Sequence, residues 1–163
     1  CGAGPVLRRP DQPDGPVNDV LAIVVPLLER FEGLYLKPYI CPAGVATIGL
    51  GSTRYLDGRL VRMTDPPITR GHAYALAKDQ LRREYLPGVL ALCPGADTTE
   101  RIAALTDFAY NLGVTALRGS TMRKRVNEQD WEAARREIMK WTRGGGRVLP
   151  GLVARRRAEA ALL

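Results

Sequence analysis

The spacing of apolar residues changes along the chain from a helical start to a short β-prone middle. Apolar positions from Asn18, a suitable N-cap, to Glu32 predict a helix that Pro26 should kink or restart. Between Tyr35 and Met63, short β-prone runs alternate with turn residues such as Asp57-Gly58. This alternation predicts a small antiparallel sheet built from hairpins.

After Pro66-Pro67 the helical period returns and predicts four further helices. Thr69 should cap a helix that stops at Pro87-Gly88, and Asp97 with Glu100 resembles the capping box of a second helix. A third helix should open at Asn127, with apolar residues on one face, and the fourth covers residues 152–163. One face of the third helix consists of Trp131, Ala134, Ile138 and Trp141.

Residues 1–17 have the composition of a linker, with four prolines and three glycines. We therefore expect a flexible leader over residues 1–17 and one folded domain over residues 18–163. The chain opens on Cys1-Gly2 rather than Met, so an upstream targeting segment or domain is one expectation.

Composition and charge narrow the class of protein. The chain of 163 residues is 45% hydrophobic and 25% charged, which argues against a disordered, collagen-like or coiled-coil protein. Its net charge of +7 favours a polyanionic partner: nucleic acid, anionic membrane or acidic cell-wall polymer. Residues 118–157 hold twelve basic and four acidic residues, so the excess lies near the C-terminus. The longest apolar run, Val20–Leu28, contains Pro26 and is too short to span a bilayer.

Glu32 is the first candidate for chemistry. It ends the first predicted helix, between Phe31 and Gly33, where the negative end of the helix dipole and apolar neighbours favour a protonated carboxyl group. A general acid needs that protonated form. On these features alone, an exposed glutamate without a catalytic role remains the alternative.

No pattern predicts a metal or a cofactor. The only histidine, His72, has no second His, Cys or acid at ligand spacing, so we expect it at the surface. The glycines at 144–146 lack the preceding strand and the following Lys-Ser/Thr of a phosphate loop. They predict a turn or hinge before the last helix.

Glu32 also begins a longer spaced pattern. Cys41 follows it after eight residues and Thr47 after five more, opening the segment Thr47-Ile48-Gly49-Leu50-Gly51. Residues 104–113 and the series from Trp141 to Arg155-Arg156-Arg157-Ala158-Glu159 follow in order. Together, over residues 20–163, these motifs resemble the phage endolysin lysozymes of glycoside hydrolase family 24. The resemblance implies an α+β, mostly helical, lysozyme-like fold of two lobes, with a small antiparallel β-hairpin sheet, a helical C-terminal lobe and a cleft between them.

The same resemblance implies roles for single residues. Glu32 corresponds to the general acid, Cys41 to the second catalytic residue and Thr47 to the threonine beside the attacking water. Cys41 stands where many members carry Asp, and its role as base, nucleophile or orienting group stays open. A C-terminal basic residue that pairs with the glutamate matches Arg155, with Arg156 one register away. Substrate binding is assigned to Arg155 and to two residues of the loop after Thr47, namely Ser52 and Thr53.

The cysteine count is odd: Cys1, Cys41 and Cys93. In an oxidising compartment this count fits one disulfide and one free thiol. We predict that Cys1 pairs with Cys93 and leaves Cys41 free. Pairing of Cys1 with Cys41 would resemble family members that are exported inactive, and a Cys-Gly start also matches the mature end of a lipoprotein.

The leading hypothesis is an endolysin, a muramidase that hydrolyses the β-1,4 bond between N-acetylmuramic acid and N-acetylglucosamine in peptidoglycan. It would act as a monomer in the periplasm of the infected host after export, with transient contact between its basic C-terminal lobe and anionic membrane. A lytic transglycosylase needs no second catalytic residue, so Cys41 and Thr47 favour hydrolysis. A non-catalytic wall-binding domain would not need Glu32. A nucleic-acid-binding protein is indicated by charge alone, without a helix-turn-helix or zinc pattern, so we expect no nucleic-acid partner.

Overall fold

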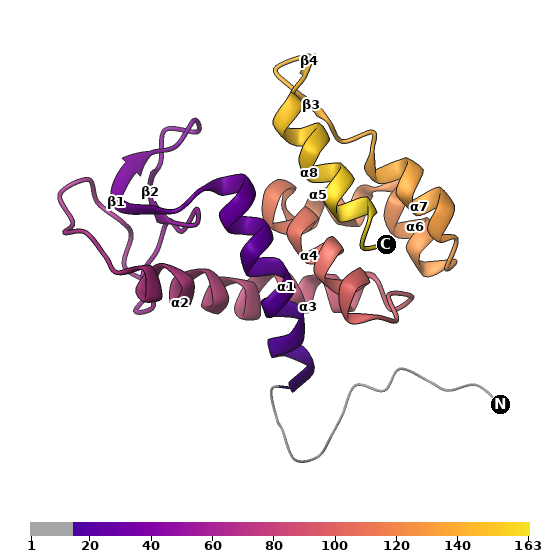
Figure 1. Ribbon diagram of the computed structural model, residues 1–163, viewed down its shortest axis with the longest axis horizontal. Helices are drawn as coiled ribbons and strands as arrows, with labels where there is room; N and C mark the ends of the chain where they lie inside the picture. Colours follow the sequence, from indigo (N-terminus) through magenta and orange to yellow (C-terminus); the bar gives the residue numbers. More distant parts are fainter. Residues whose placement is uncertain (1–14) are drawn as a thin grey trace.

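The computed structural model describes residues 15–163, which form mostly helices and two short antiparallel hairpins (Figure 1). All but the last three residues of the expected leader lie outside this range. The helices are α1 (Gly15–Glu32), α2 (Arg70–Gln80), the π-helical turn η1 (Leu81–Tyr85), α3 (Leu86–Leu92), α4 (Thr99–Leu112), α5 (Val114–Gly119), α6 (Thr121–Asn127), α7 (Trp131–Ile138) and α8 (Pro150–Ala160). The strands are β1 (Tyr35–Ile40), β2 (Ala46–Gly49), β3 (Arg143–Gly144) and β4 (Arg147–Val148).

Helix α1 begins earlier than predicted and is not divided at its internal proline. It starts three residues before Asn18, with Pro16 in the first turn, where a backbone N–H has no helical partner to lose. Pro26 lies inside the helix on its exposed side, as does Ala22, the residue whose carbonyl loses its usual donor. Of the two predicted effects of Pro26, a kink or a restart, the restart is wrong, because α1 is continuous through this residue. The helix runs on to Glu32.

The predicted sheet is present but smaller than expected. Strands β1 and β2 pair antiparallel, with Tyr39 opposite Thr47. Around the turn at Asp57-Gly58, pairing is limited to a single bridge between Arg54 and Leu60. A small apolar cluster of Ile48, Val61 and Leu76 joins this β lobe (residues 35–68) to α2.

The helical lobe, α3 to α8 together with α1, is built around α4. Every residue from Ile102 to Ala109 is buried, and α1, α3, α5 and α8 all contact this helix. Phe108 meets Trp141 edge-on, with ring centroids 5.4 Å apart. The α+β, mostly helical, two-lobed arrangement predicted from the sequence is confirmed.

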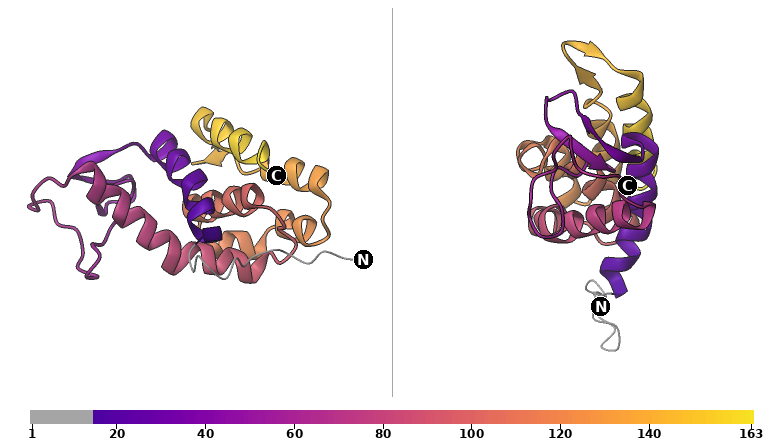
Figure 2. Two further views of the ribbon diagram at one scale, coloured as in Figure 1. Left: turned by 60° about the horizontal axis from the view of Figure 1, so that its bottom comes forward. Right: turned by 90° about the vertical axis from the view of Figure 1, so that its left-hand side faces the viewer.

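The helix after Thr69 does not stop at Pro87-Gly88 as predicted. Thr69 caps α2 by accepting a hydrogen bond from the backbone N–H of His72, but the chain then continues through η1 into α3 (Figures 1 and 2). Pro87 falls in the first turn of α3, the position where proline is tolerated. The three segments form a row that leads from the β lobe to the helical lobe.

Several boundaries in the helical lobe also differ from the prediction. Thr98, not Asp97, caps α4, because its hydroxyl accepts from the N–H of Arg101 while Asp97 pairs with the Arg101 side chain. Asn127 ends α6 instead of opening a helix, and Asp130 caps α7. Helices α5 and α6 were not predicted.

The expected turn at the three glycines is a hairpin, β3–β4, whose two central glycines have positive φ. His72 is exposed, as predicted. Among residues 15–163, no helix is long and apolar enough to cross a membrane.

Candidate active site

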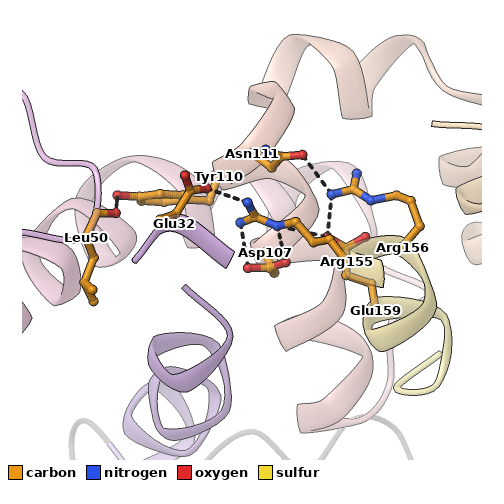
Figure 3. A network of polar contacts seen from close by, with 8 residues as sticks. All are labelled: Glu32, Leu50, Asp107, Tyr110, Asn111, Arg155, Arg156 and Glu159. Atoms are coloured by element: carbon orange, nitrogen blue, oxygen red, sulfur yellow. Dashed lines mark hydrogen bonds and ion pairs between the residues drawn. The ribbon is translucent and has the colours of Figure 1, made fainter. Parts of the chain in front are cut away.

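Glu32 lies at the C-terminal end of α1, where Gly33 turns the chain toward β1 with a φ of +81°. The Glu32 side chain is 28% exposed, so it is held by the protein and still open to solvent. Its Oε1 accepts a hydrogen bond from Nη1 of Arg155 at 2.5 Å (Figure 3). A partly exposed carboxyl group is thus fixed by a cation from α8, 123 residues later in the chain.

Arg155 is held in turn by Asp107 of α4. Its Nε and Nη2 donate to the two carboxylate oxygens of Asp107, both at 2.9 Å, and the Arg155 side chain is only 3% exposed. Burial opposes the charge, but the hydrogen bonds and charges of Asp107 and Glu32 outweigh it and raise the pKa of Arg155. Arg155 is therefore a permanent cation between two carboxyl groups.

Arg156 points to a different set of partners. Its Nη2 donates to Asn111 Oδ1 at 2.9 Å and to Glu159 Oε1 at 2.8 Å (Figure 3). Its guanidinium lies 5.0 Å from the centroid of the Phe108 ring. The structure thus pairs Arg155, not Arg156, with Glu32. Arg155 presents almost no surface of its own to a ligand, and the substrate contact also assigned to it stays a prediction.

Glu159 is fully buried beside these arginines. Its Oε2 has no hydrogen-bond partner, and its Oε1 lies 3.7 Å from Nε of Arg155. Burial raises the pKa of Glu159 to about 10, and the neighbouring Asp107 contributes to the rise. Glu159 is therefore a neutral acid at neutral pH.

Cys41 and Thr47 meet at the end of the β hairpin. A tight turn joins the two strands there, with the N–H of Cys41 donating to the carbonyl of Val45 at 3.0 Å. Hydrogen bonding to the Val45 backbone, then to the Thr47 hydroxyl, lowers the pKa of the partly exposed Cys41 thiol. Thr47 itself is buried, and its hydroxyl donates to the Val45 carbonyl at 2.9 Å. The thiol, not the threonine, is the accessible group.

Tyr39 connects these two parts of the site and was not predicted. It lies opposite Thr47 in the sheet. Burial, then the nearby charge of Glu32, raises the pKa of Tyr39, and Cys41 adds a smaller effect. Tyr39 therefore lies close enough to Glu32 and Cys41 for both groups to affect its pKa. The position of Tyr39 opposite Thr47 could have indicated its place in the site, but the sequence alone does not determine how β1 pairs with β2.

The loop after β2 separates Ser52 from Thr53. Ser52 bonds through its backbone to Ile48 and is 2% exposed, with its hydroxyl buried and unpartnered. This bridge turns the Ser52 side chain into the protein, and its contact with substrate stays a prediction. Thr53 instead lines a cavity of about 430 Å³, together with Tyr55, Arg83 and Tyr85.

Two aromatic residues lead from this cavity toward Glu32. The ring centroids of Tyr85 and Tyr110 lie 5.0 Å apart. The Tyr110 hydroxyl donates to the carbonyl of Leu50 at 2.9 Å (Figure 3). Gly51 allows this contact, since it has a φ of +106° and a Cβ there would lie 3.1 Å from the same hydroxyl. The β lobe is thereby joined to α4 beside the site.

Among residues 15–163, no candidate metal site is found. No group of three or more His, Cys, Asp or Glu side chains could hold a metal ion there. Cys93 has a free thiol, and burial raises its pKa to about 11. Cys1 lies outside the described residues. The pairing of Cys1 with Cys93 therefore stays a prediction, and the Cys93 sulfur lies in the main apolar core.

Comparisons with known proteins agree on one family. The family model described as "Phage lysozyme" matches residues 29–159. The endolysin of Acyrthosiphon pisum secondary endosymbiont phage 1 is 35% identical over 144 residues, which covers 83% of this chain and 91% of that protein. The SAR-endolysin of Escherichia phage Mu is 31% identical over 142 residues, covering 83% and 75%. The endolysin of Bacillus phage B103 is 34% identical, but the chain spans only 50% of its length.

Solved structures show the same similarity. A P22 lysozyme variant superposes with a TM-score of 0.72 at 28% identity, covering 89% of this chain and 94% of that one. The muramidase domain of SpmX from Asticaccaulis excentricus gives a TM-score of 0.68 at 30% identity, covering 86% and 93%.

Proposed function

The chain belongs to the phage lysozyme family, and from this premise we propose that Glu32 is its general acid. The protein is a lysozyme-type glycoside hydrolase, an endolysin with peptidoglycan as its substrate and host lysis as its role. The observation that supports Glu32 most directly is its partial exposure beside the buried Arg155. Because Oε1 is bonded to Arg155, Oε2 is the oxygen that holds the proton and gives it to the glycosidic oxygen.

Cys41 is the second catalytic residue in this proposal. Its partly exposed sulfur and lowered pKa favour a thiolate at the end of β1. A negative charge there stabilises the positive charge that develops on the sugar as the bond breaks. Thr47 acts through Cys41 and the Val45 carbonyl, since it is buried and bonded to both.

The substrate chain would extend from Glu32 past Thr53 into the cavity beside Tyr85. Its lining of aromatic, charged and hydroxyl groups suits a polar sugar with apolar faces. Exposed basic residues on α6, α7 and the β3–β4 hairpin add a long-range attraction to anionic wall polymer or lipid. The protein works on the cell wall after export, and we place it in the host periplasm as a monomer.

Clearing of a suspension of purified peptidoglycan tests the acid. Glu32→Gln keeps the shape and removes the acid, and should lower the clearing rate by about 10²- to 10⁴-fold. Glu29→Gln is the matched control: it lies one turn earlier on α1 and pairs with Arg70 and Tyr74, away from Arg155. It should clear at close to the wild-type rate. Equal clearing by Glu32→Gln and wild type would refute the assignment.

Mass spectrometry of the digested wall separates this reaction from its competitor. Hydrolysis adds water and leaves reducing N-acetylmuramic acid ends. A lytic transglycosylase leaves 1,6-anhydro ends, so their predominance would contradict the proposed hydrolysis.

A further inference from the structure

Asp107 is a fully buried carboxylate that touches the proposed catalytic acid only through Arg155. Its two oxygens take two of the Arg155 donors, and a third donor remains for Glu32. We propose that Asp107 is a positioning residue that offsets the charge of Arg155, so that Glu32 can keep the proton it must donate. This inference rests on the proposed role of Glu32 as general acid.

The charges explain why such a residue is needed. A cation in contact with a carboxyl group favours its ionised form. Arg155 alone would therefore draw the proton off Glu32, although it orients the side chain well. Asp107 supplies an opposite charge at 2.9 Å on the far side of the same guanidinium. Arg155 can then act on Glu32 mainly as an oriented hydrogen-bond donor.

Other titratable groups around Arg155 and Glu32 do not supply this charge. Glu159 lies 3.7 Å from Arg155 but is neutral at neutral pH, and Arg156 adds positive charge. Three tyrosines face the site from other elements: Tyr39 of β1, Tyr85 of η1 and Tyr110 of α4. Burial raises the pKa of each tyrosine, so all three are neutral. Among residues 15–163, the carboxylates that hydrogen-bond Arg155 are Asp107 and Glu32.

Asp107 also orients the guanidinium group of Arg155. A carboxylate that accepts two parallel N–H groups fixes the plane of the guanidinium. Asp107 is itself fixed, because it lies between Thr106 and Phe108 in the buried stretch of α4. The direction of Nη1 toward Glu32 is thus set from the core of the helical lobe.

The test is the dependence of the wall-clearing rate on pH. Asp107→Asn preserves the shape of the side chain and removes its charge. The alkaline limb of its profile, where the acid loses its proton, should move to lower pH by about one unit. Asp97→Asn is the matched control: it removes an exposed carboxylate that pairs with Arg101 beside the same helix. Its limb should coincide with the wild-type limb.

Two outcomes would overturn the inference. One is an alkaline limb that stays in place in Asp107→Asn. The other is a rate lowered by the same factor at every pH, which is the result expected of a purely structural residue. Should Glu32→Gln prove as active as wild type, the proposed acid would fail first. If Glu32→Gln is inactive and the alkaline limb of Asp107→Asn stays at the wild-type position, the role of Glu32 stands and only the role of Asp107 fails.

A second comparison covers the case in which Asp107→Asn does not fold. Replacing both members of a buried ion pair is tolerated better than removing one. In Arg155→Gln, the negative charge of Asp107 near Glu32 is no longer offset by a cation and disfavours ionisation of Glu32. The alkaline limb of this variant should therefore move to higher pH. Arg155→Gln combined with Asp107→Asn should return the limb toward its wild-type position. Coincident limbs in the single and double variants would refute the role of Asp107.

Discussion

Glu159 gives the clearest quantitative prediction, because its replacement by Gln removes the titratable proton without changing the shape of the side chain. Its pKa rises from an ordinary 4.5 to about 10 on burial, so the folded protein holds a proton there that the unfolded chain has lost. Between those pH values, this one group lowers the free energy of unfolding by about 1.4 kcal/mol for each unit of rising pH. Its stabilisation is complete below the ordinary pKa and is lost as pH climbs toward the folded value.

Glu159→Gln carries no titratable proton, so this contribution disappears. From about pH 6 to about pH 8, wild type should lose roughly 3 kcal/mol of unfolding free energy more than the variant. Urea unfolding at the two pH values, followed by circular dichroism, measures both slopes. Glu132→Gln is the control, since its side chain is 84% exposed and should leave the wild-type slope unchanged. Equal losses in wild type and Glu159→Gln would refute a protonated Glu159.

Two further predictions concern cysteines and glycines. Iodoacetamide should modify Cys41 at least about 100-fold faster than Cys93 in the native protein, because burial raises the pKa of Cys93 by two units while that of Cys41 is lowered. Peptide mapping measures the two rates, and similar rates would contradict the assignment. Gly95→Ala should cost about 1–3 kcal/mol, since its Cβ would lie 2.4 Å from a backbone oxygen of α6. Gly119→Ala, with no atom within 4 Å of the new Cβ, should be neutral or slightly stabilising in thermal unfolding; equal losses would refute the steric reasoning.

The sequence predicted the parts of the fold that depend on local pattern. The run ending at Glu32 and the cap at Thr69 both follow from neighbouring residues, and both are found. Local rules failed where a neighbour offered a competing choice. Thr98, not the neighbouring Asp97, caps α4. Pro87 lies in the first turn of α3 and does not end the helical segment that precedes it.

The residues of the site that were predicted are those that follow a recognisable spacing in the sequence. Asp107 was missed because it stands within an otherwise apolar stretch, where the pattern indicates core packing. Its partner Arg155 lies 48 residues away, on an element that reaches it only in the folded state. The burial of Ser52 was not predicted for a related reason: its backbone bridge to Ile48 decides which way the side chain points, and no period in the sequence predicts that bridge.

The contact between Glu32 and Arg155 also sets an order of events during synthesis. The two residues are separated by 123 positions, so a ribosome working at about 5–20 residues per second completes Arg155 roughly 6–25 seconds after Glu32. During that interval the nascent chain holds the acid but not the cation that orients it. Enzymatic competence therefore waits until α8 has left the ribosome and packed against α4.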